Sequence, residues 1–292
     1  MKRISTAQQS LDTIERGMYG AKNLKNSLAL LYHQNTKLNK FDQIKLSHSI
    51  RGFFSPYVTQ RAVQPYKIYP GTKTVPLADY RDVPAPAVDF VDLVRQRQST
   101  RNYAPGYQLS LYELFVMLNY SYGVSRQEQT PEGNSMSFRY IPSPGGLYPL
   151  EIYVVLFDSH VTPGLYHFRP DTLELECLKE GDFRAELKQH IQAEPYININ
   201  VASGIVITTG IFERIMIKYG ERGYRFMLHE SGFVGQMMTL LGEALGLGSC
   251  MVGGYDDQKI NRFLGVNGVF ETVQNILILG KKLPTPACHV DN

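Results

Sequence analysis

The sequence predicts a domain in which buried β-strands alternate with α-helices. Three apolar runs rich in Ile and Val, residues 150–157, 203–210 and 273–280, have the composition of strands that are buried on both faces. Between these runs, the apolar patterns of residues 211–220 and 225–248 predict helices. Taken alone, this alternation suggests a doubly wound α/β sheet.

The predicted helix at 225–248 is apolar on almost every side, with Gly232 and Gly235 inside it. Such a helix is typical of one that is buried all round, and its glycines would let a second helix approach closely. A chain of 292 residues has limited room to bury it completely. We therefore expect a homodimer in which two copies of this helix pack together.

Residues 1–85 differ from the rest of the chain in their apolar pattern and proline content. Leucines at helical spacing predict one helix over residues 22–34, and the proline-rich stretch 53–86 predicts extended, turn-rich chain. We place a boundary near residue 85, so that residues 86–292 form the main domain. The first segment is either a tail that wraps the core or a docking surface for a peptide.

Composition narrows the class of protein. Hydrophobic residues make up 43% and charged residues 20% of the chain, as in ordinary globular proteins, so disorder is not expected. A net charge of +3 without a Lys/Arg stripe gives nucleic-acid binding little support. The cysteines, Cys177, Cys250 and Cys288, share no metal-ligand spacing, and neither a signal sequence nor a membrane span is visible. We expect a reduced, cytoplasmic protein without a metal.

The stretch RQRQSTRNY contains Arg97, Ser99 and Arg101. Because the two arginines are four residues apart, a helix or tight turn would direct both at one point, with the serine hydroxyl nearby. Two guanidinium groups and a hydroxyl form a good receptor for a phosphate monoester. The alternative is a solvated, arginine-rich helix end.

A loop of small residues precedes the apolar run at 150–157. Pro142, Ser143 and Gly145 belong to the sequence PSPGG, whose backbone a flat ligand could approach closely. An ordinary turn before a strand would explain the same residues.

Gly253 and Gly254 follow an apolar run in the sequence GSCMVGGYDD. Loops at strand ends commonly build ligand sites, and the two glycines could expose backbone amides to a cofactor ring. A plain turn is the alternative interpretation.

Lys218 and Tyr219 end the apolar helix predicted at 211–220. A partly desolvated lysine has a lowered pKa and can act as a base, and a neighbouring tyrosine can donate or relay a proton. The alternative is a lysine that only stabilises the negative end of its helix.

Together and in this order, these segments resemble the SagB/ThcOx-type dehydrogenases, the FMN-dependent azoline oxidases of the nitroreductase superfamily. The most specific matches are KYGERGYRFMLHESGFVGQ (218–236), PSPGGLYPLEIYVV (142–155) and GLYHFRP (164–170). The resemblance extends from about Val88 to Lys282.

The resemblance implies an α+β nitroreductase-like fold with a mainly antiparallel central sheet, flanked by helices, and an intertwined homodimer with FMN at its interface. Arg97, Ser99 and Arg101 would hold the FMN phosphate and ribityl chain. The 142–146 loop, with Pro142, Ser143 and Gly145, would line the flavin ring, which the backbone of Gly253 and Gly254 would also approach. Lys281, or its neighbour Lys282, would reach the phosphate, and Lys218 with Tyr219 would be the catalytic pair.

The implied activity is the oxidation of peptide thiazolines or oxazolines to thiazoles or oxazoles in the biosynthesis of a ribosomally made natural product. Partners would be an azoline-containing precursor peptide and a cyclodehydratase. One alternative is an FMN oxidoreductase that acts on a nonribosomal-peptide intermediate or on a small enone or nitro compound. An alternative of another class is a non-catalytic scaffold subunit that only binds a peptide.

Overall fold

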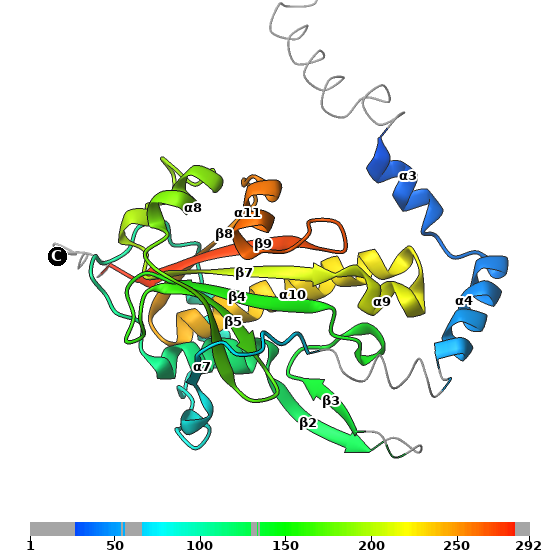
Figure 1. The fold of residues 1–292 in the computed structure, drawn as a ribbon, viewed down its shortest axis with the longest axis horizontal. Helices are drawn as coiled ribbons and strands as arrows, with labels where there is room; N and C mark the ends of the chain where they lie inside the picture. Colours follow the sequence, from blue (N-terminus) through cyan, green and yellow to red (C-terminus); the bar gives the residue numbers. More distant parts are fainter. Residues whose placement is uncertain (1–26, 54, 56–65, 130–132, 134, 284–292) are drawn as a thin grey trace, which may run out of the picture. The chain divides into compact units, whose positions relative to one another are not determined.

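The computed structural model describes residues 27–53, 55, 66–129, 133 and 135–283 (Figure 1). The chain forms two compact units, residues 1–50 and 51–292. In the first unit, α3 (Leu28–Asn35) begins at Ser27, whose hydroxyl accepts a hydrogen bond from the backbone N–H of Leu30. The helix predicted at 22–34 therefore corresponds in part to α3, and residues 22–26 lie outside the described residues. The helix α4 (Lys40–Phe53) follows.

The second unit is built around a seven-stranded sheet with the order β1-β6-β5-β4-β7-β9-β8. Its strands are β1 (Thr74–Pro76), β4 (Leu150–Leu156), β5 (Gly164–Arg169), β6 (Glu174–Glu180), β7 (Gly204–Ile211), β8 (Leu247–Val252) and β9 (Glu271–Lys281). Every neighbouring pair in this sheet is antiparallel. The α+β fold class is therefore confirmed, and the doubly wound sheet suggested by the alternation alone is wrong.

Helices cover both faces of the sheet (Figure 1). Alternate residues of β4 point to opposite faces, as strand geometry requires. Ile152 and Val154 pack in one core with α7 (Leu111–Tyr122) and α10 (Arg222–Ala244). Tyr153 and Val155 pack in the other core with α8 (Arg184–His190) and α11 (Asp257–Leu264). Among the described residues, the remaining elements of this unit are a hairpin of β2 (Val124–Gln129) and β3 (Ser135–Arg139), the helices α6 (Phe90–Gln96) and α9 (Phe212–Tyr219), and three short 3-10 turns.

The long helix α10 confirms the predicted helix but not its all-round burial. Its buried residues, Gly223, Met227, Glu230, Ser231, Val234, Gly235, Met238, Thr239 and Gly242, recur every three or four positions along one face. Leu228 and Phe233 remain 44% and 45% exposed, and a Cβ added to Gly232 would meet no atom within 4 Å. Within one chain, the helix is buried along one face only.

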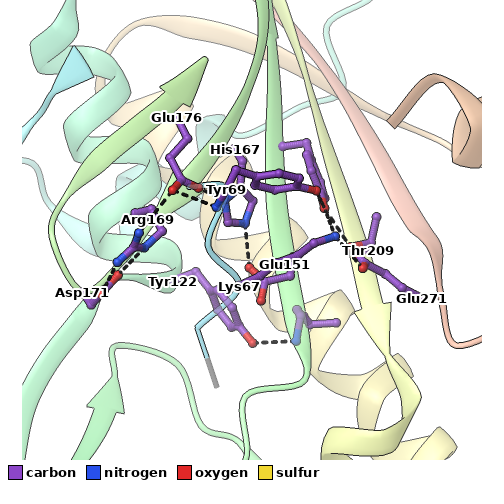
Figure 2. Close-up of polar contacts among 12 residues, drawn as sticks. Lys67, Tyr69, Tyr122, Glu151, His167, Arg169, Asp171, Glu176, Thr209 and Glu271 are labelled. Atoms are coloured by element: carbon purple, nitrogen blue, oxygen red, sulfur yellow. Dashed lines mark hydrogen bonds and ion pairs between the residues drawn. The ribbon is translucent and has the colours of Figure 1, made fainter. Parts of the chain in front are cut away.

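Residues 66–80 pack on the sheet, although the sequence assigns them to the first segment. Lys67 donates hydrogen bonds to Tyr153 and Glu271, at 2.8 and 2.7 Å, and the backbone N–H of Tyr69 donates to Glu176 (Figure 2). The strand β1 then pairs with β6. These contacts are those expected of a segment that wraps the domain. The boundary near residue 85 and the role of the first segment in peptide docking remain predictions.

Candidate active site

Lys218 and Tyr219, the Lys–Tyr pair, stand at the end of α9, which follows β7 directly and stops at Gly220. The side chain of Lys218 points into the protein, because the residue is only 8% exposed. Burial lowers the pKa of Lys218 and raises the pKa of Tyr219. Burial therefore shifts Lys218 toward an amine that can accept a proton, beside a phenol that can donate one.

The 142–146 loop lies directly against this pair. Gly145 has a φ of 69°, a left-handed conformation that side chains rarely adopt. A Cβ at this position would lie 2.5 Å from the Tyr219 hydroxyl and 2.9 Å from the Lys218 amine. The structure thus brings together the loop and the catalytic pair that the sequence predicted separately. Pro142 precedes them on the exposed side of the loop.

Beneath the loop lies a residue that the sequence analysis missed, Glu230 of α10. It is completely buried and accepts hydrogen bonds from the Ser143 hydroxyl at 2.6 Å and from the Tyr122 hydroxyl at 2.8 Å. Burial raises the pKa of Glu230 to about 7, against the opposing effects of these hydrogen bonds and of the Arg139 charge. The sequence does contain a sign of this residue. Glu230 lies three residues after Met227 and four before Val234, so a carboxylate stands on the helix face whose apolar residues point into a core.

Gly253 and Gly254, which the sequence analysis assigned to the flavin ring, line a separate cleft of about 620 Å³. We call it the Arg101 cleft. It is lined by Arg101, Gln192, Ala193, Tyr196, Ile197, Cys250, Met251, Val252, Gly253 and Gly254. Its volume falls within the range of about 300–1,000 Å³ that is usual for small-molecule sites. Arg101 and the two glycines therefore line one cleft.

The two places lie along one helix. Glu230 supports the 142–146 loop, and a Cβ at Gly235 would lie 2.8 Å from the end of the Met251 side chain, which lines the Arg101 cleft. Five residues of α-helix span only about 7.5 Å. Met251 thus links α10 to the cleft, whose apolar lining residues Ala193, Ile197, Cys250 and Val252 belong to the core on the opposite face of the sheet.

Arg97 and Ser99 do not lie in the helix or tight turn that the sequence suggested. The helix α6 ends at Gln96, so Arg97 and Arg101 do not share a helix face, and that expectation is wrong. Ser99 instead lies beside Ser249 of β8 in a parallel bridge. In an extended chain, alternate side chains point to the same side, so the spacing of Arg97, Ser99 and Arg101 still permits a common direction.

Lys281 ends β9 and lies outside the Arg101 cleft. Its amine is 3.5 Å from the carbonyl of Leu245, just after α10, and 4.9 Å from the centre of the Tyr107 ring. The neighbouring Lys282 forms an ion pair with Glu243. The geometry therefore does not join Lys281 to Arg101 or to the two glycines.

Residues 94–281 match the sequence profile of the nitroreductase family. The chain belongs to the nitroreductase family. A nitroreductase of Methanocaldococcus jannaschii is 30% identical over 194 residues, which cover 65% of this chain and 92% of that protein. The microcin B17-processing protein of Escherichia coli is 24% identical over 143 residues, which cover 47% of this chain and 52% of that protein.

Solved structures show the same nitroreductase fold. A protein of Anabaena variabilis superposes with a TM-score of 0.67 and 24% identity, over 87% of this chain and 46% of that one. A chain of the Escherichia coli microcin synthetase complex, solved with a truncated precursor bound, superposes with a TM-score of 0.55 and 20% identity, over 89% and 100% of the two chains. This nitroreductase-family oxidoreductase thus spans about half the length of the Anabaena and microcin B17-processing proteins.

Within the described ranges, no three His, Cys, Asp or Glu residues are grouped so that they could hold a metal ion. Among the helices of the same ranges, none is long and apolar enough to cross a membrane.

Proposed function

We propose that this nitroreductase-family protein is an FMN-dependent oxidase that converts peptide thiazolines or oxazolines to the aromatic azoles. The observation that carries the proposal is the Lys–Tyr pair, with Lys218 buried and Tyr219 half-buried, in contact with Gly145. The likeness to the microcin B17-processing protein, over about half of each chain, supports the choice of a peptide substrate.

The residues present fit FMN. The Arg101 cleft has the volume of a small-molecule site, and a Cβ at Gly253 would meet no atom within 4 Å, so the backbone there faces open space. Arg101 is exposed and offers a planar set of donors that suits a phosphate. We assign the phosphate to Arg101 with Arg97 and Ser99, and the flavin ring to the 142–146 loop and to Gly253 and Gly254. Lys281 lies outside the Arg101 cleft.

The chemistry of the substrate assigns the roles within the Lys–Tyr pair. The azoline ring proton next to the carbonyl and imine is acidic, and its removal needs a base with a free electron pair. Burial favours the neutral amine of Lys218 and the protonated phenol of Tyr219. Lys218 is therefore the base, and Tyr219 orients it or the ring by a hydrogen bond. The chemistry that bound FMN would supply is acceptance of the hydride from the adjacent ring carbon, with dioxygen as the final oxidant.

The proposal includes two partners of the chain. A second copy would cover the exposed side of α10, where Leu228 and Phe233 flank the open Gly232. A cyclodehydratase would supply the azoline rings, as the assembly of the microcin synthetase complex suggests.

A direct assay tests the proposal. The purified protein, loaded with FMN, is incubated in air with a peptide that carries one azoline, and the peptide mass is followed. The expected result is a loss of two hydrogens, with no change in the same peptide before cyclisation. A protein that binds no FMN and leaves the azoline unchanged would instead be a scaffold subunit.

A further inference from the structure

Two hydrogen bonds reach the buried carboxyl group of Glu230, and two more orient the hydroxyl groups that donate them. The Ser143 hydroxyl donates to one carboxyl oxygen and accepts from the backbone N–H of Tyr148 at 3.0 Å. The Tyr122 hydroxyl donates to the other oxygen and accepts from the backbone N–H of Leu150 at 3.0 Å, the contact drawn beside Tyr122 in Figure 2. Two side chains therefore link Glu230 to the backbone on the C-terminal side of the loop.

The direction of these bonds favours an ionised Glu230. A backbone N–H can only donate, so each hydroxyl accepts at its oxygen and turns its single proton toward the carboxyl group. A carboxylate accepts both protons, whereas a protonated carboxyl would direct a third proton at one of the two hydroxyl oxygens, and that hydroxyl would have to turn its own proton away from the carboxyl group. Protonation of Glu230 therefore costs one of the hydrogen bonds that hold the 142–146 loop from below.

The upper side of the same loop holds the catalytic pair. Gly145 lies two residues from Ser143, and a Cβ there would collide with both Lys218 and Tyr219. A shift of the loop of a few tenths of an ångström would thus be transmitted to the Lys218 amine. Misplacement of a reacting group by about 1 Å can cost roughly 100-fold in rate.

We propose that Glu230 is a positioning residue: its ionised carboxylate holds the 142–146 loop in the shape that seats Lys218 and Tyr219, and its protonation releases the pair. The positioning role rests on the proposed function only in its first test, which uses azoline oxidation as the assay. The ionisable groups that act on Glu230 are Tyr122 of α7, Arg139 of β3 and Tyr148 after the loop.

The test compares Glu230→Gln, which has the shape and neutrality of the protonated acid, with Glu243→Gln, the same change in an ion-paired glutamate further along α10. The rate of azoline oxidation is measured across pH. In the wild type and in Glu243→Gln, we expect the rate to fall as the pH drops through about 7. In Glu230→Gln, the fall in rate near pH 7 should be absent. The rate of this variant should stay as low as the wild-type rate below pH 7. A wild-type profile in Glu230→Gln would overturn the proposal.

A second readout needs neither substrate nor FMN. Lys218 is acetylated with trace acetic anhydride at about pH 8, and mass spectrometry of its peptide gives the rate. We expect a severalfold change in Glu230→Gln and in Tyr122→Phe, which removes the second donor, and none in Glu243→Gln. Equal rates in all four proteins would refute the positioning role. If labelling responds to Glu230→Gln but the wild type oxidises no azoline, the proposed function fails and the positioning role stands.

Discussion

The reactivity of the proposed site depends on how deeply Lys218 is buried. Replacement by Ala should leave a folded protein that binds FMN, while azoline oxidation falls by roughly 10²–10⁴, the usual contribution of a general base. Tyr219→Phe should give a smaller loss, because burial keeps this phenol protonated and a hydrogen bond is all that it provides.

The measurement is the turnover rate per bound flavin, with the unfolding free energy as its control. A lysine that only stabilises the end of α9 would contribute up to about 1 kcal/mol of stability and would leave turnover near the wild-type rate. Full activity in a flavin-loaded Lys218→Ala variant would therefore rule out this residue as the base.

Gly145 and Gly146 offer a matched pair of substitutions. Both have a left-handed backbone, with φ values of 69° and 66°, so Ala costs similar backbone strain at either position. A Cβ at Gly145 would collide with Lys218 and Tyr219, whereas at Gly146 it would lie 3.6 Å from Met136 and Phe138, an ordinary contact. We expect Gly145→Ala to reduce turnover about 100-fold relative to Gly146→Ala, as misplaced catalytic groups do. Equal activities would mean that the loop does not position the pair.

His167 makes the stability of the fold depend on pH. Its two ring nitrogens lie 2.8 Å from carboxyl oxygens of Glu151 and Glu176 (Figure 2), and ionised carboxylates only accept, so both nitrogens carry a proton. Burial opposes this charge, but the hydrogen bonds to the two glutamates outweigh it and raise the pKa of His167.

Because the folded-state pKa is the higher one, the stabilisation is fully present below about 6.5, the pKa of an unfolded histidine, and is lost as the pH rises through the folded pKa. Urea unfolding across this range should show wild-type stability falling with pH. The decline should be shallower in His167→Gln, and parallel curves for the two proteins would contradict the assignment.

At the scale of elements, the apolar runs identify β4, β7 and β9 because burial on both faces leaves a local pattern. The direction of pairing leaves no such pattern. The strand β4 lies beside β7 although β5 and β6 intervene in the sequence, so only the family resemblance indicated an antiparallel sheet.

The candidate site could be predicted in part for the same reason. Lys218, Ser143 and Gly145 belong to distinctive short motifs, but their proximity depends on how α9 packs against the loop. Glu230 was missed because its partners, Ser143 and Tyr122, come from distant segments. The common helix face assumed for Arg97 and Arg101 failed because α6 ends early and Ser99 pairs with β8.

The exposed side of α10 leads to a prediction about assembly. If a second copy covers Phe233, a charge at this position would be buried without a partner and would oppose association. We expect sedimentation at micromolar concentration to show a dimer for the wild type and a monomer for Phe233→Glu. Gln258→Glu on α11, across the sheet, is the control and should remain dimeric. A wild-type monomer that is folded and binds FMN would contradict the proposed dimer.

At the scale of the whole molecule, the proposed function requires two separate places to act in one reaction. The Arg101 cleft would hold the cofactor, and the Lys–Tyr pair would remove the substrate proton. If both act on one azoline ring, loss of the ring hydrogens and reduction of the flavin must occur together, since the reaction transfers one proton and one hydride.

The most direct test is therefore a single turnover without oxygen. The FMN-loaded protein is mixed with a peptide that carries one azoline, and the flavin absorbance and the peptide mass are recorded on the same sample. The account predicts that the yellow absorbance disappears as azole forms, with one azole for each flavin reduced. An unchanged peptide beside fully oxidised flavin, in a folded protein that binds the peptide, would contradict it.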